Sequence, residues 1–237
     1  MTEGLRSRQV NRDGVSLTRH MAVIMLAVFF LSVGGCGKPP RENSIVFLYP
    51  DAKKKPLYIP GVSRRERWKK LVEENMDAPL EAKLASVNDF FNDLEHVEDR
   101  YLWDRDDYWA SLPEVLERNG GDCEDAAIAK YFTLRYLEIP EESLRLTYVI
   151  SLKTGKPHMV LTFFSDSSAE PIVLDTMSRH LFPVSKRPDL MPVYSFNSQG
   201  YWLARKQESW RGQRLGGPDK LSRWRSVLER MRSREQS

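Results

Sequence analysis

Residues 120–129 read GGDCEDAAIA, and this stretch sets the position of a cysteine at the start of a helix. Its two glycines break the preceding segment, and Asp122 is suited to cap a new helix. Alanine and leucine residues favour continuing that helix as far as Pro140, which cannot continue it. We therefore predict that Cys123 lies in the first turn of a helix.

A cysteine in this position has the environment of a nucleophile. The unsatisfied backbone N–H groups at a helix start and the helix dipole favour the negative charge of a thiolate, which is the reactive form. The two glycines before Cys123 permit close approach of a substrate backbone, and its N–H could act as one oxyanion donor. The alternative is that Cys123 is a small buried apolar side chain.

Three segments downstream of the cysteine are rich in β-branched and aromatic residues and predict antiparallel strands: they span residues 144–152, 158–164 and 171–175. His158 begins the second segment and Asp175 ends the third. A cysteine nucleophile needs a base to accept its proton, and a third group must hold that base in one orientation. A cysteine, a histidine and an aspartate, in this order along the chain, supply the three types of residue. We predict a triad of Cys123, His158 and Asp175, although His158 alone would be an ordinary strand histidine and Asp175 alone a turn former.

The remaining pattern predicts an α+β fold. The spacing of apolar residues predicts a helix at 85–92, and Ser111 with Pro113 suits the start of a short helix at 111–119. Residues 183–201 read as an irregular proline-rich passage. A final helix has one apolar face, made of Leu221, Trp224, Leu228 and Met231. We expect this face to pack on the domain; a partner or a membrane is the alternative.

Length and composition indicate one domain with terminal extensions. The chain has 237 residues, of which 41% are hydrophobic, enough for one sizeable core. We divide it into an export signal at 1–36, an N-terminal extension with a first helix at 37–84, a core that contains the predicted triad at 85–203, and a basic tail with an amphipathic helix at 204–237.

The N-terminus is typical of exported bacterial proteins. Arginines precede an almost uncharged apolar run at residues 21–35, which is shorter than the roughly twenty residues of a membrane-spanning helix. The run ends in Val33-Gly34-Gly35-Cys36, which is similar to a lipoprotein cleavage box. Cleavage there would leave an acylated Cys36 as a lipid anchor; a soluble protein cut nearby and an uncleaved anchor are the alternatives. We expect the domain to be periplasmic.

Charge and cysteine content narrow the function classes. The first 38 residues account for the whole formal charge of +3, so the rest of the chain is neutral and gives no support for nucleic-acid binding. The chain has 2 cysteines, and with Cys36 acylated or removed, Cys123 is the cysteine that the exported domain keeps. A catalytic role would account for its presence.

Several motifs together resemble one family: they are Gly121-Asp122-Cys123-Glu124-Asp125, His158-Met159-Val160-Leu161, Val173-Leu174-Asp175, and Asp189-Leu190 through Pro192-Val193-Tyr194-Ser195-Phe196-Asn197. Over residues 85–202 this pattern resembles the bacterial transglutaminase-like cysteine proteinases, which include the adhesin-releasing LapG proteases. The resemblance implies a papain- and transglutaminase-like α+β fold, in which the catalytic cysteine opens a helix packed on an antiparallel sheet that carries histidine and aspartate. It assigns Cys123 as nucleophile, His158 as general base and then acid, and Asp175 as the group that orients the imidazole. Thr176 departs from the asparagine expected after the aspartate.

Negative charge is crowded around the cysteine. Asp122, Glu124 and Asp125 would oppose formation of a thiolate unless a positive charge is bound. Ca²⁺ prefers oxygen ligands, carboxylates among them, and the resemblance implies a calcium site held by Asp122 and Glu124. The alternative is that Asp122 only caps the helix and that the other two form an ordinary acidic first turn, with Asp125 as a capping partner.

The resemblance implies a calcium-dependent periplasmic cysteine endopeptidase. The implied substrate is the N-terminal region of a large surface adhesin, cut at a small-residue linker so that cells leave a biofilm. The implied partner is an inner-membrane receptor for cyclic di-GMP that sequesters the protease. Two alternatives remain: a transglutaminase or amidase acting on another acyl donor such as cell-wall peptide, and a non-catalytic binding module. Candidates for a second oxyanion donor are Asn88, Asn92, Trp103 and Trp109.

Overall fold

The computed structural model describes residues 62–166, 169–204 and 210–235. The predicted export signal at 1–36, the lipid anchor at Cys36 and most of the N-terminal extension lie outside these residues. Within the described ranges, no helix has the length and apolar character needed to cross a membrane.

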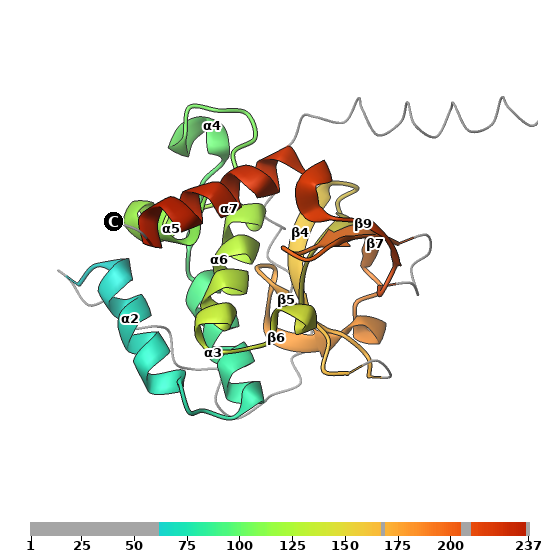
Figure 1. Cartoon of the computed structure of the whole chain (residues 1–237), viewed down its shortest axis with the longest axis horizontal. Coiled ribbons are helices and arrows are strands. Elements are labelled where there is room, and N and C mark those ends of the chain that lie inside the picture. Colours follow the sequence, from blue (N-terminus) through green and yellow to red (C-terminus); the bar gives the residue numbers. More distant parts are fainter. Residues whose placement is uncertain (1–61, 167–168, 205–209, 236–237) are drawn as a thin grey trace, which may run out of the picture. The chain divides into compact units, whose positions relative to one another are not determined.

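The described helices surround one long central helix. They are α2 (Arg64–Asn75), α3 (Leu80–Asn92), α4 (Asp99–Leu102), α5 (Leu112–Arg118), α6 (Cys123–Tyr136) and α7 (Ser222–Glu235). Short 3-10 turns lie at Glu141–Ser143, Val184–Lys186 and Pro218–Lys220. In the described part, α6 packs against α3 and α5 on one side and against strands of the sheet on the other, as Figure 1 shows.

The sheet is antiparallel and follows the order β6-β5-β4-β3-β7-β8-β9. Its strands are β3 (Leu144–Ser151), β4 (Pro157–Phe163), β5 (Ile172–Asp175), β6 (Ser178–Pro183), β7 (Leu190–Phe196), β8 (Tyr201–Leu203) and β9 (Gln213–Gly216). A separate parallel pair joins β1 (Glu95–His96) to β2 (Gly120–Gly121). The predicted antiparallel α+β fold is therefore confirmed.

One earlier expectation about the sheet is wrong. Residues 183–201 were expected to be irregular, but β7 lies within them and pairs with both β3 and β8. Pro192 is accommodated because the β3–β7 register shifts between Tyr148 and Val149, and a bulge tolerates a residue that has no backbone N–H to donate. The prolines of this passage therefore led to a wrong prediction for β7, which is an inner strand of the sheet.

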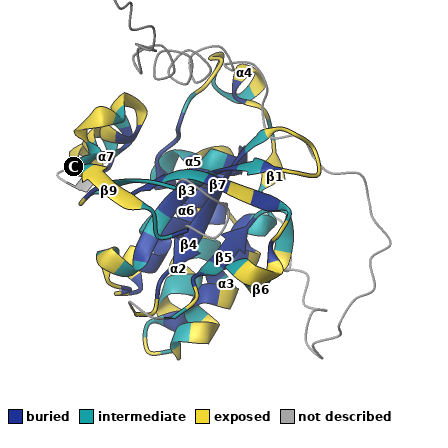
Figure 2. Cartoon of the chain, turned by 90° about the vertical axis from the view of Figure 1, so that its right-hand side faces the viewer, coloured by how far each residue is buried: buried dark blue, intermediate teal, exposed yellow. Residues whose placement is uncertain are grey.

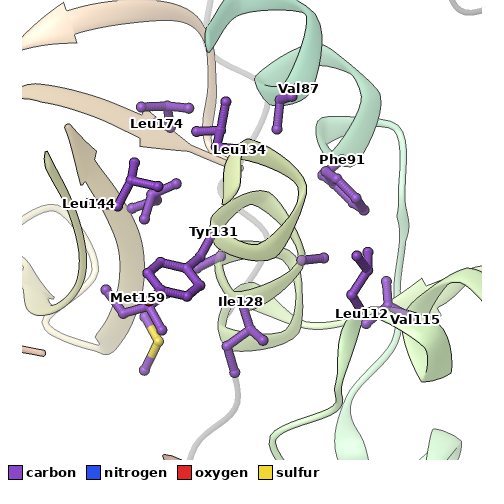
Figure 3. Packing of buried hydrophobic residues seen from close by; sticks show 14 of the residues in the cluster. Val87, Phe91, Leu112, Val115, Ile128, Tyr131, Leu134, Leu144, Met159 and Leu174 are labelled. Carbon is purple, nitrogen blue, oxygen red and sulfur yellow. The ribbon is translucent and has the colours of Figure 1, made fainter. Parts of the chain in front are cut away.

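The core is built around α6, whose residues are buried along nearly its whole length (Figure 2). Tyr131 and Ile128 project from this helix into the core, and Figure 3 shows two groups of side chains flanking it. The sheet supplies Leu144, Met159 and Leu174, and the helices supply Val87, Phe91, Leu112 and Val115. Small alanines elsewhere on α6 let both layers approach closely, so the helix that begins at Cys123 is held from two sides.

Helix α7 packs on the domain through the apolar face predicted from the sequence. Trp224 is fully buried, and its ring contacts Tyr131 and Phe132 of α6 and Phe196 of β7. Met231 is also buried in the same core cluster. The C-terminal helix thus closes the core beside α6.

Candidate active site

The start of α6 is shaped by tight packing between Gly121 and Asp125. A Cβ added to Gly121 would meet the Asp125 Cβ at 2.8 Å and its Oδ2 at 2.9 Å, so a larger residue would displace that carboxylate. Asp125 Oδ1 accepts a hydrogen bond from the Ala110 N–H (2.7 Å), and Asp122 Oδ1 accepts one from the Asp125 N–H (3.5 Å). Asp122 is therefore the N-cap, as predicted, while Asp125 anchors the segment before α5.

Cys123 is the first residue of α6 and is 2% exposed. Its Sγ lies 2.9 Å from Oε2 of Glu124. Helix α6 packs against β4, so the helix that begins at Cys123 rests on the strand that carries His158. The predicted nucleophile is thus placed at a helix start beside a carboxylate and next to the sheet.

His158 and Asp175 are brought together by the antiparallel pairing of β4 with β5. Leu161 is opposite Leu174 in that pairing, so the beginning of β4 lies beside the end of β5. The His158 Nε2 and the Asp175 Oδ1 are 2.6 Å apart, and both side chains are buried. The structure therefore joins the two predicted residues by a direct hydrogen bond in a site shielded from water.

Asp175 has further partners that the sequence interpretation missed. Its Oδ2 accepts a hydrogen bond from Nη2 of Arg187 (2.7 Å), and its Oδ1 also accepts one from the Met177 N–H (3.0 Å). Arg187 is itself buried and binds Asp189 Oδ1 and Oδ2, each at 2.9 Å. The only signal in the sequence was the short spacing between Arg187 and Asp189, inside a passage expected to be irregular.

The charge on Asp175 is stabilised by these contacts. Burial alone would raise the pKa of this carboxyl group, but the His158 imidazole and the Arg187 guanidinium together hold the pKa well below its ordinary value. Asp175 is therefore an anion that can keep a neighbouring imidazole in one orientation.

This depressed pKa predicts a loss of stability in acid. The contribution of Asp175 is fully present above its unfolded-state pKa of about 3.9 and is lost as the pH falls through the lower folded-state pKa. Near neutral pH, we expect the Asp175→Asn variant to have a free energy of unfolding about 3 kcal/mol below that of wild type, because it breaks a buried ion pair. Below about pH 4 the difference should narrow. Urea denaturation of both proteins across this range measures it.

A matched control for that measurement is Glu229→Gln, which removes a carboxylate from the exposed ion pair with Arg225. Its difference from wild type should stay small at every pH. If the gap between wild type and Asp175→Asn were constant down to the lowest pH, Asp175 would not be held as an anion in the folded protein.

Carboxylates gather at the start of α6, and they come from more of the chain than predicted. Ligand atoms of Asp122, Cys123 and Glu124 lie within 4.8 Å of one another. Asp99 and Asp107 form a second such group with Glu124, and Asp99 also groups with Asp122 and Asp125. Asp107 belongs to the acidic segment after α4, and no sequence motif connects this segment to Cys123. These clusters could hold a metal ion.

The electrostatics of this carboxylate cluster fit a cation. Burial and mutual repulsion raise the pKa of Asp122, and burial raises the pKa of Glu124 and that of Asp125, so their combined negative charge is unfavourable without a counter-charge. Burial raises the pKa of Asp99 to about 6. Within the described residues, Asp99 Oδ1 is buried and has no hydrogen-bond partner. An oxygen-rich set with an unsatisfied buried oxygen suits a hard cation such as Ca²⁺.

The four candidates for a second oxyanion donor are all engaged elsewhere. Trp103 Nε1 donates to Asp125 Oδ2 (3.4 Å), and the side chain of Trp109 hydrogen-bonds to the Asp107 carboxylate while its ring stacks on Phe196. The amide groups of Asn88 and Asn92 donate to main-chain carbonyls of the β5–β6 turn. The structure therefore favours none of them in that role.

Comparison with known proteins identifies the family. The model of the bacterial transglutaminase-like cysteine proteinases matches residues 64–208. This chain belongs to that family. Among solved structures it is similar to Legionella pneumophila LapG in an EGTA-treated form, with 40% identity over 71% of this chain and 88% of that chain and a TM-score of 0.64. It is also similar to the calcium-bound form of Legionella pneumophila LapG, with 39% identity over 71% and 89% of the two chains and a TM-score of 0.62.

Family membership defines the general class of activity. No curated protein matches the chain significantly, so the class comes from the family model and the LapG structures. These make the chain a cysteine protease of transglutaminase-like fold, as the motifs around Cys123 predicted.

Proposed function

We propose that this cysteine protease is a calcium-dependent endopeptidase that works in the periplasm with a triad of Cys123, His158 and Asp175. The observation that carries the proposal is the buried hydrogen bond between His158 and Asp175, on the sheet against which the Cys123 helix packs. In this proposal the nucleophile, the base and the orienting group come from α6, β4 and β5, and acyl transfer by a thiol uses these three types of group.

The proposal gives each nitrogen of His158 a role. Asp175 accepts a hydrogen bond from a protonated Nε2, and Nδ1 would then be the atom that accepts the proton of the Cys123 thiol. The thiolate then attacks the peptide carbonyl carbon, and Nδ1 returns the proton to the leaving amine as the C–N bond breaks. Water, deprotonated by the same nitrogen, cleaves the resulting thioester and restores the thiol.

Calcium would be held by Asp122 and Glu124, with Asp99 and Asp107 as further ligands. Bound there, it would supply the positive charge that lets a thiolate exist among these carboxylates. The solved relatives include a calcium-bound and an EGTA-treated Legionella pneumophila LapG, which supports the choice of ion.

The proposed substrate is the N-terminal region of a large surface adhesin, cut at a linker of small residues so that cells leave a biofilm. The export signal at 1–36 and the lipoprotein-like Cys36 support a periplasmic location, free or lipid-anchored. An inner-membrane receptor for cyclic di-GMP is the proposed partner that sequesters the enzyme. These assignments rest on the likeness to LapG.

The test is cleavage of a purified N-terminal fragment of an adhesin that is encoded near this protein, with calcium present and with products identified by intact mass. We expect two fragments that meet within the small-residue linker, and none when the linker carries bulky residues instead. A primary amine in the same reaction provides the control for acyl transfer.

Three results would contradict the proposal, each in a different way. Incorporation of the amine without cleavage would indicate a transglutaminase, and release of ammonia or action on cell-wall peptide alone would indicate an amidase. Tight binding of the fragment without any reaction would indicate a binding module.

A further inference from the structure

Lys130 is a buried lysine that has no part in the proposed reaction. It lies two turns after Cys123 on α6, its side chain is fully buried, and burial lowers its pKa to about 7. Among the described residues, no carboxylate lies within ion-pair distance of its Nζ. Burying a lysine without a carboxylate partner costs free energy of folding. The hydrogen bonds that Lys130 makes therefore indicate which part of the structure it stabilises.

Those contacts are two asparagine side chains of the neighbouring helix. Lys130 Nζ donates to Oδ1 of Asn88 (2.8 Å) and to Oδ1 of Asn92 (2.7 Å). The two asparagines are four residues apart on α3 and therefore face the same way. Lys130 fixes both amide groups by occupying their oxygens, which leaves their N–H groups directed elsewhere.

The amide N–H groups point to the turn that follows Asp175. Asn92 Nδ2 donates to the main-chain carbonyls of Asp175 (2.9 Å) and Ser178 (2.8 Å). Asn88 Nδ2 donates to the carbonyls of Ser178 and Arg179, each at 3.1 Å. The β5–β6 turn is thus attached to α3 at the residue that binds the catalytic histidine.

The network connects the two halves of the proposed triad. Lys130 is rigidly placed by α6, the helix that Cys123 begins, while the carbonyl of Asp175 belongs to the strand end that orients His158. Among the described residues, the asparagine side chains of α3 bridge the two. A displacement of the turn by about 1 Å would misalign Asp175 with the imidazole, and errors of that size cost enzymes about 10²-fold in rate.

We propose that Lys130, through Asn88 and Asn92, is a positioning residue that fixes the Asp175 turn relative to the helix of Cys123. The inference rests on the proposed triad. The network of Lys130, Asn88 and Asn92 would support the site from the core and would touch neither the substrate nor the reacting atoms.

The test uses Lys130→Met, which keeps the length of the side chain and removes its donors, and Asn92→Asp, which keeps a partner for Lys130 but places an oxygen opposite the two carbonyls. The matched control is Thr133→Val, on the same helix, which removes the buried acceptor of the Trp68 indole N–H and touches no residue of the turn. The first readout, made on the whole exported protein without substrate, is the downfield proton resonance of the imidazole N–H bonded to Asp175. His158→Gln assigns this resonance.

We expect the resonance to shift or disappear in Lys130→Met and Asn92→Asp and to stay in Thr133→Val. In cleavage assays kcat should fall about 10- to 100-fold in the first two variants with KM unchanged. An unaltered resonance and kcat in both would overturn the inference, as would equal losses in Thr133→Val. If Lys130→Met does not fold, Asn92→Asp decides the question. If wild type cleaves no adhesin, the proposed function fails, but the substrate-free resonance still decides the role of Lys130.

Discussion

Substituting Cys123 by alanine is expected to lower kcat/KM for peptide cleavage by about 10⁴- to 10⁶-fold while the protein stays folded. The loss should be this large because, in the proposed mechanism, the Cys123 thiol forms the acyl-enzyme, and His158 and Asp175 would act through that thiol. Folding should survive, since Cys123 is a small side chain at the first position of α6 and Asp122 still caps the helix. Initial rates on the adhesin fragment, with circular dichroism as a check on folding, measure both.

The control for this variant is Cys123→Ser, which has a side chain of similar size and replaces the thiol by a hydroxyl. It should be nearly as inactive, because the hydroxyl of serine is far less acidic than the thiol of cysteine and far less nucleophilic near neutral pH. A Cys123→Ala variant that still cleaved the fragment at more than a few per cent of the wild-type rate would exclude Cys123 as the nucleophile.

Removing calcium is expected to abolish cleavage and to lower the melting temperature. Without the ion, several buried carboxylates face one another at the start of α6, and one oxygen of Asp99 has no partner in the described structure. A ligand that binds only the folded state stabilises it, by about 2.7 kcal/mol at a concentration 100 times its Kd. Thermal denaturation and cleavage rates, with a chelator and after calcium is restored, test this directly.

The Asp99→Asn variant distinguishes an effect on calcium binding from an effect on the stability of the fold. It removes one charge from the carboxylate cluster, so the Kd for calcium, measured by titration calorimetry, should rise at least about 10-fold. Glu117→Gln, which removes an exposed carboxylate paired with Arg234, is the control and should leave the Kd as in wild type. Cleavage that continues in the chelator would refute calcium dependence and leave the triad intact.

The sequence predicted those features of the site that depend on residues close together in the chain. Asp122 as N-cap and Cys123 in the first turn follow from adjacent residues, and the structure has both. His158 and Asp175 could be paired because two successive strands of a hairpin must lie side by side. Local rules were sufficient wherever the partners were neighbours in sequence or in consecutive strands.

The rest depends on contacts that only the assembled fold creates. Asp99 and Asp107 lie close to Glu124 because the segment after β1 folds back over the start of α6. No local sequence pattern predicts this arrangement. The contact of Arg187 with Asp175 was not predicted, because Arg187 follows a short 3-10 turn in a proline-rich passage in which β7 was not recognised as a strand. A buried lysine such as Lys130 reads in sequence as a surface residue, since its asparagine partners are about forty positions away.

The enclosure of α6 between two layers has a consequence for the lifetime of the active form. A helix packed on both faces exchanges its amide hydrogens only when the whole molecule opens, whereas α4 and the segment after it lie at the margin of the core. Loss of the proposed calcium ion would therefore loosen the acidic segment after α4 before it disturbs the backbone at the start of α6 that carries Cys123. The enzyme could then rest in an inactive but folded state and recover without refolding when the ion returns.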